Sequence, residues 1–217
     1  QAIKESGMEY GSRTGLVRRG YEITQQLNAR SSQLDKAYPL PKLMLDDNVV
    51  PPVLEESKDN LNKDSNTALR LSDATYKITE NAHFVTTPPT WRDYLLVGLT
   101  YSVEVPNPTL MPKTPEEKQV WEEAVKEGWQ VGIKQANQIF NVQLNKLERD
   151  IKGMGLYRSL LTRNMVTKPF VAVSNLGVTG DNKKINVNDR VLRITALAGL
   201  KTDSKEWKPV GVPVYGK

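Results

Sequence analysis

The clearest hydrophobic pattern in the chain begins at Thr114 and predicts one long amphipathic helix. At about 100 degrees per residue, the apolar side chains of residues 115–152 fall within one arc, and the opposite side is charged. Thr114 can cap this helix, Pro115 suits its first position, and Glu117 completes a Thr-x-x-Glu capping box. With about 1.5 Å of rise per residue, the helix would be roughly 55 Å long. The apolar arc consists of Trp121, Val125, Trp129, Ile133, Ala136, Ile139, Phe140, Leu144, Leu147 and Ile151.

A second helical pattern covers residues 1–36, where Leu16, Ile23, Leu27 and Leu34 fall on one side. This pattern predicts a continuous helix at the N-terminal end of the sequence. After the long helix, the KGMGLY stretch carries two glycines that allow a stop or a bend. A further helical stretch then reaches about residue 165.

Both predicted helices carry glycines at a spacing of four residues. Each glycine inside a helix costs roughly 1 kcal/mol relative to alanine, so a regular series needs a physical reason. Because this spacing aligns the glycines on one stripe, it favours a close approach of two helix backbones. We expect the two helices to cross near residues 11 and 132, with tryptophans beside the contact. The resulting packing or interface candidates are Gly7, Gly11, Gly15, Trp121, Gly128, Trp129 and Gly132.

The segments outside the long helices show patterns of strands and turns. Residues 35–60 are rich in proline, which predicts a packed loop with short strands at LMLD and NVVPPVLE. Residues 68–86 alternate apolar and polar positions and predict one or two strands. Thr90 with Asp93 favours a short helix from about residue 91, although a strand through YLLV fits the pattern nearly as well.

The last third of the chain changes character at Pro169. Residues 168–200 are rich in valine and isoleucine, with turn-forming residues at 179–182 and 186–189. This pattern predicts three short strands joined by turns. The C-terminal tail, residues 201–217, is expected to be extended and docked by Trp207.

Together these elements predict a single α+β domain over residues 1–217. Two long amphipathic helices, within residues 1–36 and 115–165, would pack beside a small, mostly antiparallel sheet. The strands of that sheet would come from the strand-rich segments 66–104 and 168–200.

The composition excludes several classes of protein. The net charge is +5, from 30 basic and 25 acidic residues in small dispersed groups, so we expect no nucleic acid as a partner. Cysteine is absent, which excludes disulfides and thiolate metal sites within this sequence and leaves the compartment open. No apolar run approaches the length of a membrane span, and the first residues lack the apolar core of a signal peptide. An exported form would therefore have lost its signal.

Residues that could carry out catalysis are sparse. His83 is the one histidine, it falls in a predicted strand, and no Gly-x-Ser-x-Gly elbow accompanies it. Asp46 and Asp47, like Glu55 and Glu56, are adjacent on extended chain and point to opposite faces, which makes each pair a poor joint ligand. The sequence therefore predicts a protein that is not an enzyme, with no cofactor and no metal site.

The residues favour a non-catalytic scaffold, and two other functions remain open beside it. A periplasmic hydrolase or glycan-binding protein could use Trp91 or Trp207 in a cleft. A pocket holding two carboxylates beside an exposed tryptophan would favour that function. A nucleic-acid-binding accessory of conjugation is the third choice, and it would show steeply salt-dependent binding to DNA.

Several motifs in the same order resemble those of the DotC family. These proteins are outer-membrane lipoproteins of the Dot/Icm (type IVB) secretion system and of related conjugation systems. The resemblance spans nearly the whole chain. It is carried by GLVRRGYEI, VVPPVLEE, the stretch from TYKI to TPPTWRDYL, VKEGWQVGIKQANQIF, RDIKGMGLY and VTGDNKKINVNDRVLRIT.

The resemblance implies a structural role and brings no catalytic residues. It implies a virulence-associated protein-transport component at the periplasmic face of the outer membrane, held there by a lipid on an N-terminal cysteine that this sequence does not contain. Its implied partners are the core-complex subunits DotD and DotH, and it would help to place DotH at the outer membrane within a multimeric ring. The same role in a plasmid-conjugation transfer apparatus is the alternative.

Overall fold

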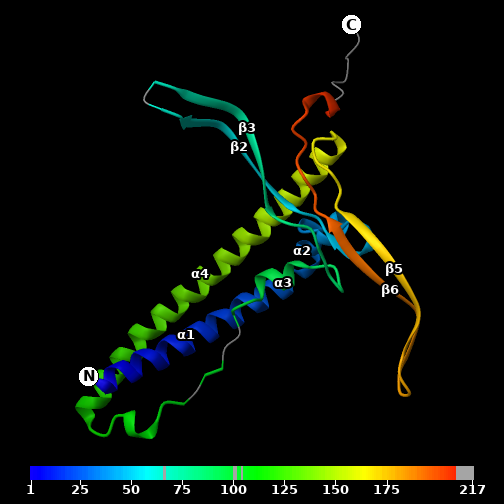
Figure 1. Ribbon diagram of the computed structural model, residues 1–217. Coiled ribbons are helices and arrows are strands. Elements are labelled where there is room, and N and C mark those ends of the chain that lie inside the picture. Colours follow the sequence, from blue (N-terminus) through cyan, green and yellow to red (C-terminus); the bar gives the residue numbers. More distant parts are fainter. Residues whose placement is uncertain (66, 100–101, 104, 209–217) are drawn as a thin grey trace. The chain divides into compact units, whose positions relative to one another are not determined.

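The computed structural model describes residues 1–65, 67–99, 102–103 and 105–208, and it has the α+β fold that the sequence predicts (Figure 1). The chain divides into two compact units, and each unit is assembled from two separate segments. Unit 1 consists of Gln1–Pro41 and Pro89–Glu148, and unit 2 of Lys42–Pro88 and Arg149–Lys217. The assignment of residues 1–217 to one domain stays a prediction.

The elements follow one another along the chain in the order that Figure 1 shows by colour. The α-helices are α1 (Ala2–Ala29), α2 (Ser31–Ala37), α3 (Trp91–Leu95) and α4 (Pro115–Thr162). Short 3-10 turns occupy Leu40–Leu43, Asp46–Asn48, Pro108–Leu110 and Ser204–Glu206. The strands are β1 (Val49–Val50), β2 (Val53–Lys63), β3 (Leu69–Glu80), β4 (His83–Phe84), β5 (Phe170–Gly180) and β6 (Ile185–Ala196).

The predicted N-terminal helix is interrupted at Arg30, which differs from the expectation of one helix over residues 1–36. Arg30 leaves helical geometry, with φ −107° and ψ 15°. Its N–H donates to the carbonyl of Leu27 at 3.1 Å, which tightens the last turn to an i to i−3 hydrogen bond. The helical segment is therefore split into α1 and the shorter α2.

Helix α4 begins as the sequence predicts. The N–H of Glu117 donates to the Thr114 hydroxyl at 3.2 Å, and the Glu117 carboxylate accepts from the N–H groups of Lys113 and Thr114. The stop that the KGMGLY glycines allow does not occur, because α4 continues through residue 153 to Thr162, close to the predicted end of the helical segment at about residue 165. Gly153 instead lies against β2, where an added Cβ would be 2.7 Å from the carbonyl oxygen of Leu54.

The strands form three antiparallel pairs in the described part of the chain, β1 with β4, β2 with β3, and β5 with β6. The small sheet of the prediction is thus divided into separate two-stranded ribbons. The predicted turn at residues 186–189 is wrong, because β6 passes through it. Asn188 takes a positive φ of 57° there, and the pairing register shifts opposite Gly177, so a β-bulge absorbs the turn-forming residues.

Two local predictions near the ends of elements can be compared with the structure. The open alternative after Thr90 resolves as helix α3, and the Asp93 carboxylate accepts from the Thr90 N–H at 2.6 Å. Trp207 docks the start of the tail, since its Nε1 donates to the Lys201 carbonyl at 3.0 Å. The predicted extended tail beyond residue 208 lies outside the described residues.

Each unit has its own buried apolar side chains. Unit 1 buries Leu16, Ile23, Leu27, Trp91, Leu95, Leu99, Ala124, Ala136 and Leu147. The core of unit 2 is a cluster of Leu54, Tyr157, Leu160, Val166 and Ala198, with partly buried Tyr76 and Ile78 against it. Helix α4 contributes to both units because it extends across residue 148.

Candidate interaction surfaces

In unit 1, helices α1 and α4 lie side by side and run in the same direction (Figure 1). Their contact is formed by Gly7, Gly11, Gly15, Gly128 and Gly132, which we call the glycine seam. All five glycines are buried. An added Cβ at Gly7 would be 2.8 Å from the carbonyl oxygen of Trp121, and an added Cβ at Gly132 would be 2.7 Å from the backbone nitrogen of Leu16.

The contact along the seam is repeated at every helical turn. The backbone opposite Gly7, Gly11 and Gly15 is that of Trp121, Val125 and Trp129, so each step of four residues on α1 matches four on α4. A Cβ atom at any of these three positions would lie closer to the α4 backbone than Cβ atoms come to other atoms in real proteins, so only glycine fits. The predicted single crossing near residues 11 and 132 is therefore replaced by a contact that extends over several turns, since the two series share one period.

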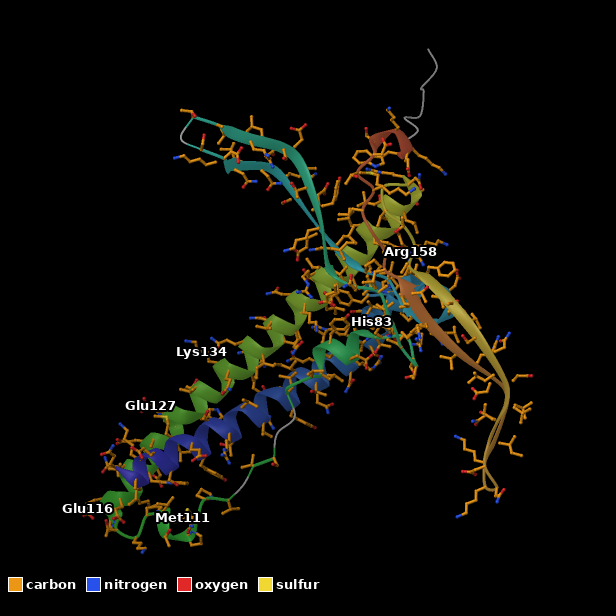
Figure 2. The ribbon with its side chains drawn as sticks, in the orientation of Figure 1. His83, Met111, Glu116, Glu127, Lys134 and Arg158 are labelled. Carbon is orange, nitrogen blue, oxygen red and sulfur yellow. The ribbon has the colours of Figure 1, made fainter. Side chains whose placement is uncertain are left out.

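The two predicted tryptophans lie beside this seam and are both partly buried. Trp121 stacks on Tyr10, with ring centroids 5.9 Å apart and an interplanar angle of 24°. Its Nε1 is buried and has no hydrogen-bond partner among the described residues. Trp129 contributes its backbone to the wall that faces Gly15. These rings pack beside the seam, while Glu127 and Lys134 occupy the exposed side of α4 (Figure 2).

Trp91 is buried and cannot stack on a sugar from solution. It is 1% exposed, its Nε1 donates to the Asp35 carboxylate at 2.7 Å, and the Arg92 guanidinium lies 4.2 Å from its ring centroid. Trp207 is 39% exposed. The part of the glycan-cleft hypothesis that used Trp91 is therefore wrong, because helix α3 turns this ring into the core of unit 1.

Two cavities in unit 1 test the same hypothesis further. One, of about 200 Å³, is lined by Ser6, Glu9, Tyr10, Arg13, Val105, Pro106, Asn107 and Leu110. The other, of about 300 Å³, is mostly apolar, and its lining includes Leu27, Leu95, Phe140 and Leu144 together with Arg19 and Arg30. Among the described residues that line them, neither cavity has two carboxylates or a tryptophan.

Unit 2 contains a buried charge that the sequence did not reveal. Asp150 on α4 is 1% exposed and accepts from Nε and Nη2 of Arg149 at 2.9 and 2.7 Å. Arg149 also pairs with Glu80 at the end of β3, and the hydrogen bond to Asp150 raises the pKa of Arg149. This cluster ties α4 to β3. In the sequence, Asp150 resembles any residue of a charged helix face, so no local pattern marks it.

The tyrosines of unit 2 are structural as well. The Tyr157 hydroxyl donates to the Thr167 carbonyl at 3.2 Å, and burial raises the pKa of Tyr157. Tyr76 donates to the Glu56 carboxylate at 2.9 Å, and its pKa is raised by burial and then by that hydrogen bond. Both groups stay protonated at neutral pH and hold hydrogen bonds between elements.

The candidates for catalysis and metal binding do not converge in the described residues. His83 is exposed at the start of β4, and its Nδ1 lies 3.3 Å from the Asn81 carbonyl (Figure 2). Over the same residues, no group of three or more histidine or carboxylate side chains is arranged to hold a metal ion. Among the described helices, none combines the length and the apolar character that crossing a membrane requires.

The comparisons with known proteins give the chain a family. No curated protein shows significant similarity to it. A family model, T4SS_TraI, described as type IV secretory system, conjugal DNA-protein transfer, matches residues 1–209. Because this match covers nearly the whole sequence, it includes both units and the glycine seam. The chain belongs to the T4SS_TraI family of the type IV secretory system, and it is a component of that kind of system.

Proposed function

We propose that the protein is a structural, non-catalytic subunit of the outer-membrane core complex of a type IVB transfer system. In this role it is held by a lipid anchor at the periplasmic face of the outer membrane and, with a DotD-like lipoprotein, places a DotH-like subunit there. The observation that carries the proposal is the family match over residues 1–209. The ordered motifs from GLVRRGYEI to VTGDNKKINVNDRVLRIT support the finer identification with DotC-like proteins.

The packing within each unit is in keeping with a scaffold. The residues that stand out in the sequence, the seam glycines and their tryptophans, serve contact between backbones, and the buried Asp150 is neutralised by Arg149. These residues hold elements together, and they are not arranged with one another for acid–base or nucleophilic chemistry. A scaffold needs rigid elements and exposed surfaces, and α4 with its 48 residues supplies the first.

The same structural role in a plasmid-conjugation apparatus is the second candidate. The family description, conjugal DNA-protein transfer, favours it. The two candidates differ in what is transferred, a protein effector or a plasmid with its attached protein, and they require the same subunit surfaces.

Deletion of the gene from its host, followed by complementation with the full-length gene, tests the proposal. We expect deletion to abolish transfer, and the DotH-like subunit to leave the outer-membrane fraction. Assays for plasmid transfer and for effector translocation, run side by side, separate the two candidates. Unchanged transfer in the deletion strain, or a protein found only in the cytosolic fraction, would overturn the proposal.

A further inference from the structure

The β2–β3 hairpin, residues 53–80, exposes a leucine face that nothing in the described chain covers. Leu61 and Leu71 are cross-strand partners, and Leu69, two residues from Leu71, lies on the same face. Their exposed fractions are 65%, 68% and 54%. We call this ribbon the acidic hairpin, because residues 53–80 hold six carboxylates and four cationic side chains, a net charge of −2.

The β5–β6 hairpin, residues 170–196, exposes a second aliphatic face. Val178 pairs with Val187 and Gly180 with Ile185, which places the three apolar side chains together. They are 68%, 70% and 68% exposed. Residues 170–196 hold two carboxylates and four cationic side chains, a net charge of +2, so we call this ribbon the basic hairpin.

Several polar groups on the opposite face and in the turn of the basic hairpin are hydrogen-bonded to one another. The Thr179 hydroxyl donates to the Asp189 carboxylate and accepts from the Asn186 amide. In the turn, the Asp181 carboxylate accepts from the backbone N–H groups of Lys183 and Lys184 at 2.8 and 3.0 Å. The ribbon is therefore locally ordered, and its aliphatic face is presented by a defined register.

A two-stranded ribbon with exposed aliphatic side chains is incomplete by itself. Isolated two-stranded hairpins are marginally stable in water. Within the described residues neither ribbon has a third strand, so its outer edges present backbone N–H and C=O groups for pairing. Grouped exposed aliphatic side chains mark surfaces for association. The high exposure of both faces also means that neither hairpin covers the other within one chain.

We propose that the basic hairpin of one copy packs on the acidic hairpin of the next copy in the assembly. One chain carries both halves of this contact, with apolar faces of similar kind and opposite net charges. The contact joins different surfaces of successive copies, and such a heterologous contact generates a ring when its rotation closes. The opposite charges orient the encounter, and the aliphatic faces exclude water once the ribbons meet. The inference rests on the proposed role of the chain as a core-complex subunit, which the family resemblance implies to be part of a multimeric ring.

Cysteine cross-linking in the mature chain tests this contact. The sequence holds no cysteine, so a single introduced thiol reports only contacts between copies. Leu71→Cys and Val187→Cys place thiols on the two exposed faces. Mixed in equal amounts and oxidised, they should give a heterotypic dimer well above the excess over each homotypic dimer that random pairing alone produces. One chain with both substitutions should give a ladder of multimers. Glu127→Cys, exposed on α4, is the matched control and should cross-link to neither hairpin.

A charge exchange then tests the choice of partner face. Lys183→Glu with Lys184→Glu reverses the basic hairpin, and the heterotypic dimer yield should fall at least several-fold at low salt. Asp64→Lys with Asp73→Lys in the partner should restore it. Lys126→Glu with Lys134→Glu makes the same change of charge on α4 and should leave the yield unchanged. Circular dichroism of each variant confirms the fold.

The outcomes separate this inference from the proposed function. If the cysteine variants restore transfer in the deletion strain but give no heterotypic dimer, the hairpin contact is wrong and the proposed role stands. A heterotypic yield no higher than random pairing of the two variants produces would also overturn it. So would binding of the hairpins to vesicles of anionic phospholipid, lost in Val178→Ser with Val187→Ser, in the absence of cross-links between copies. Unchanged transfer on deletion counts against the proposed role instead.

Discussion

Replacing Gly132 by alanine adds one carbon at the tightest part of the glycine seam. The added Cβ would overlap the carbonyl oxygen of Ser12 and would lie 2.7 Å from the nitrogen of Leu16. Both are backbone atoms of α1, so no flexible side chain can move aside. The helices must separate locally, which loosens the neighbouring contacts of Gly128 with Met8 and of Gly15 with Trp129.

The magnitude follows from two opposing terms. Alanine in a helix is more favourable than glycine by roughly 1 kcal/mol. Overpacking of a tight interior contact costs about 1 to 3 kcal/mol, and here the strain falls on backbone. Because backbone atoms cannot move aside, the overpacking cost should lie in the upper part of that range, and Gly132→Ala should destabilise by about 1 to 2 kcal/mol net. Gly132→Leu should cost several-fold more because its whole side chain must be placed.

Gly155 offers a matched control in the same helix. A Cβ there meets nothing within 4 Å, so Gly155→Ala should gain stability of about 0.5 to 1 kcal/mol from helix propensity alone. Urea unfolding followed by circular dichroism measures both variants against the unchanged protein. If Gly132→Ala matches Gly155→Ala in stability, the seam is not a close internal contact. If Gly132→Leu keeps its stability and fails only in assembly, the glycine face serves a partner subunit instead.

Four further changes have defined expectations. Thr114→Ala removes the cap of α4 and should cost about 1 kcal/mol in urea unfolding, and Thr114→Ser should retain most of that stability. Asp150→Ala removes the buried acceptor of Arg149 and should cost about 2 to 3 kcal/mol; an equally stable variant would contradict its structural role. Tyr157→Phe tests a pH effect. Because burial raises the pKa of Tyr157, its contribution to the free energy of unfolding is full below the pKa of unfolded tyrosine and is lost as pH rises through the folded pKa. The stability measured from pH 9 to 11 should therefore fall less steeply in Tyr157→Phe than in the unchanged protein. Trp91→Phe leaves Asp35 without its indole donor and should destabilise unit 1 by about 1 kcal/mol, measured by thermal unfolding.

The start of α4 was predictable because its signals are local. The capping box at Thr114 and the 3.6-residue period act within a few turns, and the helix begins where they place it. The continuity of α4 through Gly153 was not predictable in the same way. Gly153 carries the sequence signal of a stop, but its missing side chain serves a contact with Leu54, which is about a hundred residues away in the chain. A single sequence cannot distinguish a glycine needed for a turn from one needed for packing.

The strand regions also show that local sequence composition predicts some turns correctly and others wrongly. The turn predicted at residues 179–182 lies at residues 181–184, between β5 and β6, and it was recognised because Gly180, with φ of 147°, and Asp181 shape it by local geometry. The apparent turn at residues 186–189 has similar composition, yet pairing with β5 keeps it in the strand and leaves a bulge at Asn188. Asp150 escaped notice for a related reason, because its burial depends on how α4 meets β3 and on no feature of its neighbours in sequence.

The burial of the glycine seam excludes its glycines as a binding surface for partner subunits. Its five glycines are buried between α1 and α4, so a partner cannot reach them while these helices stay together. Trp91 and Asp150 are likewise enclosed within their units. The large apolar side chains that remain most exposed on regular structure cluster on the two long hairpins, whose aliphatic faces are more than half exposed. Selection for assembly should therefore act on the hairpins, and selection for folding should act on the seam. Substitutions on the hairpin faces should reduce complex formation, whereas substitutions in the seam should lower the free energy of unfolding.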